Sequence, residues 1–299
     1  MLKPNFLGDE MSDTQYLAAK SIDEAVKAHS AADGAARFLA GGTDLLVQIK
    51  SGIKKPNLVI DIKKIVELNS ISEVSENEFK IGAAVSGANL NRNKKFANLW
   101  PGVLEAFRLI GSEQIQGRAS LGGNLCNGSP AGDSVPALVA AGCTVTIAGP
   151  NGSKNIPIET FHKGPGKTVL ENGEMLVSIN FPKRAANSSD AYLRMTPRTE
   201  MDIAVVGCGV NITMENGICT HARVSLGAVA PTPLLIEEAS EIMVGTDINA
   251  DIIQKVSKLC MEACNPINDK RGTIDYRTKV AGVLFKRSVL IAIDRIKGN

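Results

Sequence analysis

The sequence predicts an α+β protein with two domains, one over residues 1–183 and one over residues 190–299. Its 299 residues are about twice the length of a usual domain. Between Pro182 and Asp190 the composition shifts to Lys, Arg, Ala, Asn and Ser without apolar periodicity, which is typical of a linker. Beyond this segment, strand patterns come first and helical patterns afterwards, which is the order of an α+β domain.

In the first domain, Ser21 and Glu24 have the spacing of a capping box and predict the start of a short helix. Residues 37–40 then read as a strand, residues 41–44 as a glycine turn, and the apolar pattern from Leu45 as a helix. Apolar alternation and β-branched runs predict further strands at residues 58–62, 79–85, 144–148 and 175–181.

Helical spacing of apolar residues from Ala88 to Ile110 predicts two helices that meet near Trp100 and Pro101. The glycine-dense tract from Gly111 to Asp133 is expected to be a loop held against other parts of the molecule. In the second domain, residues 203–214 and 218–229 flank an Asn-Gly turn and predict a hairpin. Two helices are expected over residues 251–264 and 276–296.

Composition excludes several classes of partner. The net charge is +2, without a polybasic run, so nucleic acid is not an expected partner. No apolar stretch approaches the ~20 residues that span a bilayer, and residues 1–13 lack the apolar core of a signal peptide, so we expect a cytoplasmic protein with no transmembrane segment. The six cysteines lack metal-binding spacing and only three histidines occur, so no metal site is expected.

Two double-glycine segments are the main functional candidates. Gly41-Gly42-Thr43-Asp44 offers unobstructed backbone N–H groups before an expected helix, which suits a diphosphate; a tight turn is an equally good interpretation. Ser120-Leu-Gly-Gly-Asn124 repeats this theme, and together the two segments are suited to hold one diphosphate. Asp133 is expected either to bind a ligand hydroxyl or to cap the helix that starts at Ser134.

A third glycine segment, Gly164 to Thr168, looks like part of a phosphate-binding P-loop. The full P-loop pattern requires glycine where Phe161 stands, so this interpretation fails. Neither double-glycine segment matches the GxGxxG pattern of Rossmann folds either. We therefore interpret residues 164–168 as a surface turn.

Five motifs follow one another along the chain: Ala40-Gly-Gly-Thr-Asp-Leu-Leu46, Ile110-Gly-Ser112, Ser120-Leu-Gly-Gly-Asn-Leu-Cys-Asn127, Ser129-Pro-Ala-Gly-Asp133 and Asp202-Ile-Ala204. With them the sequence resembles the FAD-binding (medium) subunits of the xanthine dehydrogenase, carbon monoxide dehydrogenase and nicotinate dehydrogenase family of molybdenum hydroxylases. The resemblance covers nearly the whole chain. It implies a p-cresol methylhydroxylase-type FAD-binding domain of two α/β subdomains, followed by a smaller α+β domain of the CO dehydrogenase flavoprotein type.

The resemblance also implies a cofactor site. The residues expected to bind FAD, without a covalent bond, are Leu39, Ala40, Gly41, Gly42, Thr43, Asp44, Leu45, Gly111, Ser120, Leu121, Gly122, Gly123, Asn124, Asp133, Leu176 and Arg194. Arg194 and Arg198 are candidates for stabilising reduced, anionic flavin, although ordinary surface arginines are an equally good interpretation. Ser120 and Arg194 replace the threonine and lysine that are common in the family. Met201 stands where several NAD-using relatives have an acidic residue.

The implied function is electron transfer within a heterotrimer. The molybdenum cofactor is expected on a large subunit and two [2Fe-2S] clusters on a small one, in agreement with the absence of cysteine clusters here. The flavin subunit would pass electrons to an acceptor such as NAD, ferredoxin or a quinone. The alternatives are a stand-alone flavin-dependent reductase of the enolpyruvyl-sugar reductase type, or a scaffold subunit without flavin.

Overall fold

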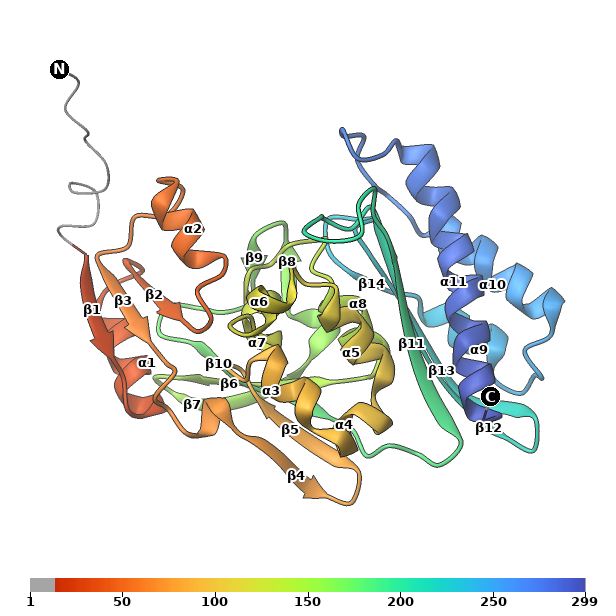
Figure 1. The fold of residues 1–299 in the computed structure, drawn as a ribbon, viewed down its shortest axis with the longest axis horizontal. Helices are drawn as coiled ribbons and strands as arrows, with labels where there is room; N and C mark the ends of the chain where they lie inside the picture. The colour runs from red at the N-terminus through yellow and green to blue at the C-terminus, as the bar shows by residue number, and fades with distance from the viewer. Residues whose placement is uncertain (1–13, 299) are drawn as a thin grey trace.

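A computed structural model describes residues 14–298 and confirms the α+β class. The expectation about a signal peptide in residues 1–13 lies outside this range. Figure 1 shows three parts in a row: a three-stranded sheet at the left, a five-stranded sheet with the helices α3–α8 in the middle, and a four-stranded sheet with α9–α11 at the right. Each part has its own cluster of buried apolar side chains.

The N-terminal part is a parallel sheet in the order β1-β3-β2, formed by Gln15–Ala18, Leu58–Asp61 and Ala36–Leu39. Helix α1 (Ile22–Ala31) begins as predicted, because the Ser21 hydroxyl accepts a hydrogen bond from the Glu24 N–H at 3.1 Å. Residues 40–44 connect β2 to α2 (Leu45–Lys50), so the predicted order of strand, glycine turn and helix is confirmed.

The central sheet is antiparallel in the order β4-β5-β10-β6-β7. Its strands are β4 (Ile71–Ser75), β5 (Glu78–Gly82), β6 (Thr144–Gly149), β7 (Gly152–Pro157) and β10 (Met175–Phe181). Short 3-10 turns lie at η1 (Glu67–Asn69) and η2 (Ile158–Thr160). Between β7 and β10 the chain makes a small separate hairpin, β8 (His162–Gly164) and β9 (Lys167–Thr168).

The helices of the central part correct two predictions. Three helices replace the expected two, namely α3 (Gly87–Arg92), α4 (Lys94–Leu99) and α5 (Pro101–Arg108), because Asn93 ends α3 and its side chain caps α4 through the Phe96 N–H. The glycine-dense tract is not only loop, since it contains α6 (Glu113–Gln116) and α7 (Leu121–Cys126), and α8 (Ser134–Ala140) follows. Ser120 caps α7 and so starts a helix within the glycine run.

The C-terminal sheet has the order β11-β12-β13-β14, with bounds Ser188–Met195, Val206–Glu215, Ile218–Gly227 and Leu234–Leu235. The predicted hairpin is β12 and β13, and it is confirmed. Helices α9 (Glu237–Met243), α10 (Ala250–Glu262) and α11 (Ile274–Ile296) complete this part. The sequence predicted α10 and α11, but not α9 or β11.

The segment interpreted as a linker, residues 182–190, is in part a strand and in part an exposed connection. Residues 188–190 belong to β11, and the side chains of Arg184 and Asp190 are buried. Strand β11 contributes Ala191 to the core of the C-terminal part and Tyr192 to the core of the central part. The division into residues 1–183 and 190–299 therefore stays a prediction.

Candidate functional site

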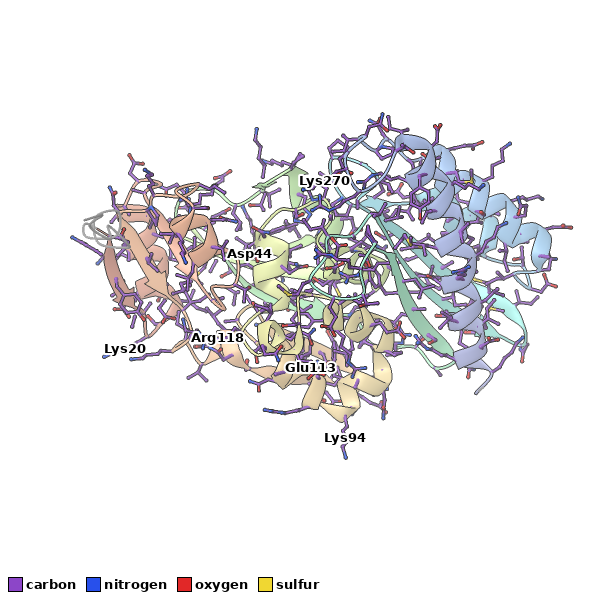
Figure 2. All side chains as sticks on the ribbon, turned by 45° about the horizontal axis from the view of Figure 1, so that its top comes forward. Lys20, Asp44, Lys94, Glu113, Arg118 and Lys270 are labelled. Carbon is purple, nitrogen blue, oxygen red and sulfur yellow. The ribbon has the colours of Figure 1, made fainter. Side chains whose placement is uncertain are left out.

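A cavity of about 790 Å³ lies between the N-terminal sheet and the central helices. Eleven of the residues that the sequence indicated line it: Ala40, Gly41, Gly42, Thr43, Asp44, Leu45, Ser120, Gly122, Gly123, Asn124 and Leu176. Figure 2 shows Asp44 between α2 and the central helices. The structure thus brings both double-glycine segments to one cavity, which is within the size range of small-molecule sites.

The close approach of the two segments depends on glycine. A Cβ at Gly41 would lie 2.6 Å from the carbonyl carbon of Arg118, in the turn that leads to α7. A Cβ at Gly122 would lie 2.7 Å from the Cα of Ala83, behind α7. Gly42 has a φ of 80°, a left-handed conformation that glycine adopts without strain. These glycines are therefore needed to pack the cavity wall, whatever the cavity binds.

The same segments present unused hydrogen-bond donors. Within residues 14–298, no acceptor receives a hydrogen bond from the backbone N–H groups of Gly41, Gly42, Thr43 and Asp44, or from those of Leu121 and Gly122. Successive free N–H groups form a concave site for anions, and buried N–H groups normally find a partner. The cavity wall is therefore equipped to bind an anionic group.

Polar side chains join the two segments. The Asn127 amide accepts from Gln48 Nε2 at 3.1 Å and donates to Asp44 Oδ1 at 3.4 Å. Asn124 uses its amide oxygen to accept from both the N–H and the hydroxyl of Ser134, at 3.2 and 2.7 Å, and so fixes the start of α8. Burial raises the pKa of the Asp44 carboxyl, which reduces its repulsion of a neighbouring anion.

Six residues indicated by the sequence lie outside this cavity wall: Leu39, Leu121, Gly111, Asp133, Arg194 and Arg198. Leu121 is buried in the central core, and Gly111 lines a second cavity of about 440 Å³ together with Thr199 and Glu200. The Arg198 side chain is exposed and pairs with Asp202. The sequence could not separate these residues from the cavity wall, because their positions depend on tertiary contacts.

Asp133 does not fill one of its two expected roles, the capping of α8, whereas its expected role toward a ligand hydroxyl stays a prediction. It precedes α8 but makes no capping hydrogen bond, and its carboxylate instead accepts from Arg194 Nη1 at 2.9 Å. Both side chains are buried. Burial raises the pKa of Asp133 to about 6, although the guanidinium of Arg194 acts in the opposite direction. Asp133 is thus a buried titratable side chain, paired with Arg194, at the contact between the central and C-terminal parts.

Replacing Asp133 with asparagine should remove a pH dependence of stability. Because the folded pKa of about 6 exceeds the ordinary value of 3.8, the folded chain keeps a proton that the unfolded chain releases between these values. The contribution of Asp133 to the free energy of unfolding therefore falls as pH rises from 4 to 6. We expect the difference between wild type and Asp133→Asn to shift by about 2 kcal/mol against wild type from pH 4 to pH 7, measured by urea denaturation. A constant difference would contradict this.

Sequence reasoning missed other parts of the wall. Arg37 and Lys54 come from the N-terminal part, and Lys163 and Lys167 come from the β8–β9 hairpin. The glycines at 164 and 166 predict the exposed turn of that hairpin, which the structure contains, but they do not indicate that the hairpin lines the cavity. His29 also lines the cavity, stacks on Phe38 at a centroid distance of 4.4 Å and has no signal in the sequence.

No group of three or more His, Cys, Asp or Glu side chains among residues 14–298 is arranged to hold a metal ion. No helix in the same range is long and apolar enough to cross a membrane.

Comparison with protein families identifies both halves of the chain. Residues 11–184 match the family described as the FAD-binding domain in molybdopterin dehydrogenase, and residues 191–292 match the CO dehydrogenase flavoprotein C-terminal domain. The first match includes both double-glycine segments. It therefore supports FAD as the anionic ligand of the cavity.

Relatives match over nearly the full length. The carbon monoxide dehydrogenase medium chain of Afipia carboxidovorans is 33% identical over 94% of this chain and 97% of its own length, and the nicotinate dehydrogenase FAD-subunit of Eubacterium barkeri is 28% identical over 97% and 99%. A solved carbon monoxide dehydrogenase chain from Hydrogenophaga pseudoflava superimposes with a TM-score of 0.90 at 33% identity, covering 94% of this chain and 98% of its own. The protein therefore belongs to the family of FAD-binding subunits of the xanthine, carbon monoxide and nicotinate dehydrogenases, and it is the flavoprotein component of a molybdenum hydroxylase-type oxidoreductase.

Proposed function

We propose that this chain binds FAD non-covalently in the 790 Å³ cavity and transfers electrons within a heterotrimer. Electrons would come from [2Fe-2S] clusters on a small subunit, after substrate oxidation at a molybdenum cofactor on a large subunit. They would leave to an external acceptor such as NAD, ferredoxin or a quinone. A cytoplasmic location stays part of this proposal.

The free backbone N–H groups at the cavity are the observation that carries the proposal. Five of them, on Gly41–Asp44 and on Gly122, come from two segments that lie against one another. A diphosphate in the middle of an extended cofactor provides acceptors for donors from both sides, which a single phosphate does less well. The residues present therefore fit a dinucleotide such as FAD.

The protein contributes binding and orientation. The flavin supplies the electron-transfer chemistry when bound, so the chain needs no general acid or base of its own. Asn127 joins the two glycine segments through its hydrogen bonds with Gln48 and Asp44, and Leu176 at the start of β10 contributes apolar surface to the cavity wall. We assign these residues to holding the cofactor in one position, which fixes the distance to its electron partners.

Arg194 is a further candidate for contact with the cofactor. It lies outside the cavity wall, but its Nε and Nη2 atoms and the Tyr192 hydroxyl are buried without a hydrogen-bond partner among the described residues. Buried donors of this kind usually have a water or ligand as acceptor. This observation supports a role for Arg194 near the flavin, whereas the exposed side chain of Arg198 has partners of its own.

Purification of the tagged full-length chain from cells that also produce its neighbouring subunits tests the proposal. We expect a large and a small partner to co-purify, with a visible flavin spectrum. Acid precipitation should release the flavin into the supernatant, because the cofactor is held by hydrogen bonds and charge alone. Reduction of the complex followed by addition of NAD, ferredoxin or a quinone then identifies the acceptor by the rate of flavin reoxidation.

Each alternative has its own result. A colourless complex with both partners indicates a scaffold without flavin. A yellow chain that emerges alone and oxidises NADPH indicates a self-contained reductase. Flavin that stays with the precipitated protein contradicts non-covalent binding.

A further inference from the structure

The β8–β9 hairpin is a part of the cavity wall that the function proposed above does not yet use. It contains the segment Gly164 to Thr168, which the sequence suggested to be a surface turn. Residues 165 and 166 do form an exposed turn, and Lys163, Gly166, Lys167 and Thr168 in addition line the same cavity as the two double-glycine segments. In Figure 1, β8 and β9 lie in the middle part of the molecule, near the labels of α6 and α7.

The hairpin is hydrogen-bonded to the glycine-rich helix α7 and to the residue Gly128 that follows it. The N–H of Gly166 donates to the carbonyl oxygen of Gly128 at 2.8 Å, and a Cβ at Gly128 would lie only 3.0 Å from the Gly166 backbone. His162 Nε2 lies 2.8 Å from the Leu125 carbonyl oxygen, so this nitrogen carries the proton and donates it. Phe161 anchors the base of the hairpin in the central core. The hairpin thus has a defined position over the cavity.

Two cations of this hairpin have no partner within the described residues. Neither Lys163 nor Lys167 forms an ion pair or a side-chain hydrogen bond among residues 14–298. Of the carboxylates in the cavity wall, Glu174 pairs with Lys154 at 2.5 Å and Asp44 accepts from Asn127, and the third, Glu171, forms no ion pair with either lysine of the hairpin. The two lysines are therefore available to an anion in the cavity.

We propose that Lys163 and Lys167 bind the diphosphate of the dinucleotide cofactor, so that the β8–β9 hairpin forms a third phosphate-binding element beside the two glycine segments. This inference rests on the proposed FAD function and adds a charge contribution to it. The glycine segments offer N–H dipoles but no formal positive charge, and a diphosphate carries a negative charge on each phosphate. Two lysines on long flexible side chains neutralise these charges at the open side of the cavity.

The experiment is a titration of FAD into flavin-free full-length chain, followed by quenching of flavin fluorescence at two salt concentrations. For the double variant Lys163→Ala/Lys167→Ala we expect about tenfold weaker FAD binding at low salt, because each solvent-exposed pair of a lysine and a phosphate contributes only modestly to the free energy of binding. High salt should reduce this difference, because ions screen charges at an open cavity. The double variant Lys163→Arg/Lys167→Arg should bind like wild type.

The matched control is the double variant Lys20→Ala/Lys94→Ala. It makes the same change in net charge, and both lysines are exposed and far from Asp44 in Figure 2. We expect it to bind FAD like wild type. Circular dichroism and melting temperature establish that all variants fold, and the single variants Lys163→Ala and Lys167→Ala serve if the double variant does not.

The possible failures are distinguishable. If wild type itself does not bind FAD, the proposed function fails. If wild type binds FAD and the alanine double variant binds equally tightly at low salt, the hairpin inference is wrong. If that variant keeps FAD affinity but loses association with the other subunits, the hairpin is instead a docking element for an acidic protein surface, and the inference is again wrong.

Discussion

Replacing Gly41 with alanine is expected to weaken FAD binding by about ten- to hundredfold. A Cβ at this position would overlap the backbone of Arg118, with 2.6 Å to its carbonyl carbon, and no rotamer change can relieve a contact with main chain. Inserting a methyl group into a packed region costs about 1–3 kcal/mol. The relief of this strain moves residues 40–44 away from the turn before α7, and the free N–H groups of the two segments then no longer meet one diphosphate.

The measurement is the Kd of FAD for the purified chain, by fluorescence quenching, together with the melting temperature without flavin. Gly117→Ala is the matched control. Gly117 has a helical φ of −60° and does not line the cavity, and the nearest atom to a Cβ there, Gln114 O at 3.2 Å, would have to move by only a few tenths of an ångström. We expect this control to bind FAD like wild type. Unchanged affinity in Gly41→Ala, in a folded protein, would show that the close approach of the two segments is not needed for the cofactor.

Local signals were sufficient for many elements of the fold. Ser21 and Glu24 predicted the start of α1 because the capping interaction involves residues three apart in sequence. The turn at Asn216 and Gly217 predicted the β12–β13 hairpin for a similar reason, since φ is positive at both positions. Such interactions are complete within a few residues, so the chain alone specifies them.

The features that the sequence did not predict depend on contacts between distant segments or on a local signal that a stronger pattern concealed. Asn93 is a good capping residue, but its effect was hidden by the continuous helical pattern around it. Asp133 pairs with Arg194, which is 61 residues away, and only the docking of β11 against α8 makes this contact. In the same way, the sequence cannot show that residues 164–168 face the cavity, because this depends on the contact of Gly166 with Gly128.

The double-glycine segments lie between these two cases. Their composition indicated anion binding, and the resemblance to a family gave the cofactor. The structure adds that glycine at 41 and 122 is required by packing of main chain against main chain, and that the N–H groups remain free for a ligand. The packing of the chain and the proposed cofactor binding therefore depend on the same residues, which explains why the two interpretations of residues 41–44 are equally good from sequence alone.

The segment that resembled a linker contains the residue whose loss should destabilise the protein most. Asp190 is buried, accepts from the Val103 N–H at 3.0 Å in the first turn of α5, and pairs with Arg184 Nη2 at 3.3 Å. Arg184 also donates to Asn211 at 2.9 Å and lies over the Trp100 ring, 4.2 Å from its centroid. This cluster joins the central helices to the C-terminal sheet.

Asp190→Ala is expected to lower the free energy of unfolding by about 3–5 kcal/mol, because it leaves the guanidinium of Arg184 buried without its counter-ion. Burial raises the pKa of Asp190 to about 6, so urea denaturation at pH 8 measures the ionised pair. Asp190→Asn keeps an acceptor for the Val103 N–H and should therefore lower the free energy of unfolding by less. As a control, replacing the exposed Asp294 with alanine should leave this free energy within about 0.5 kcal/mol of wild type. If Asp190→Ala cost under about 1 kcal/mol, water would have to reach Arg184 once the carboxylate is gone, and residues 182–190 would then behave as the linker that their composition suggested.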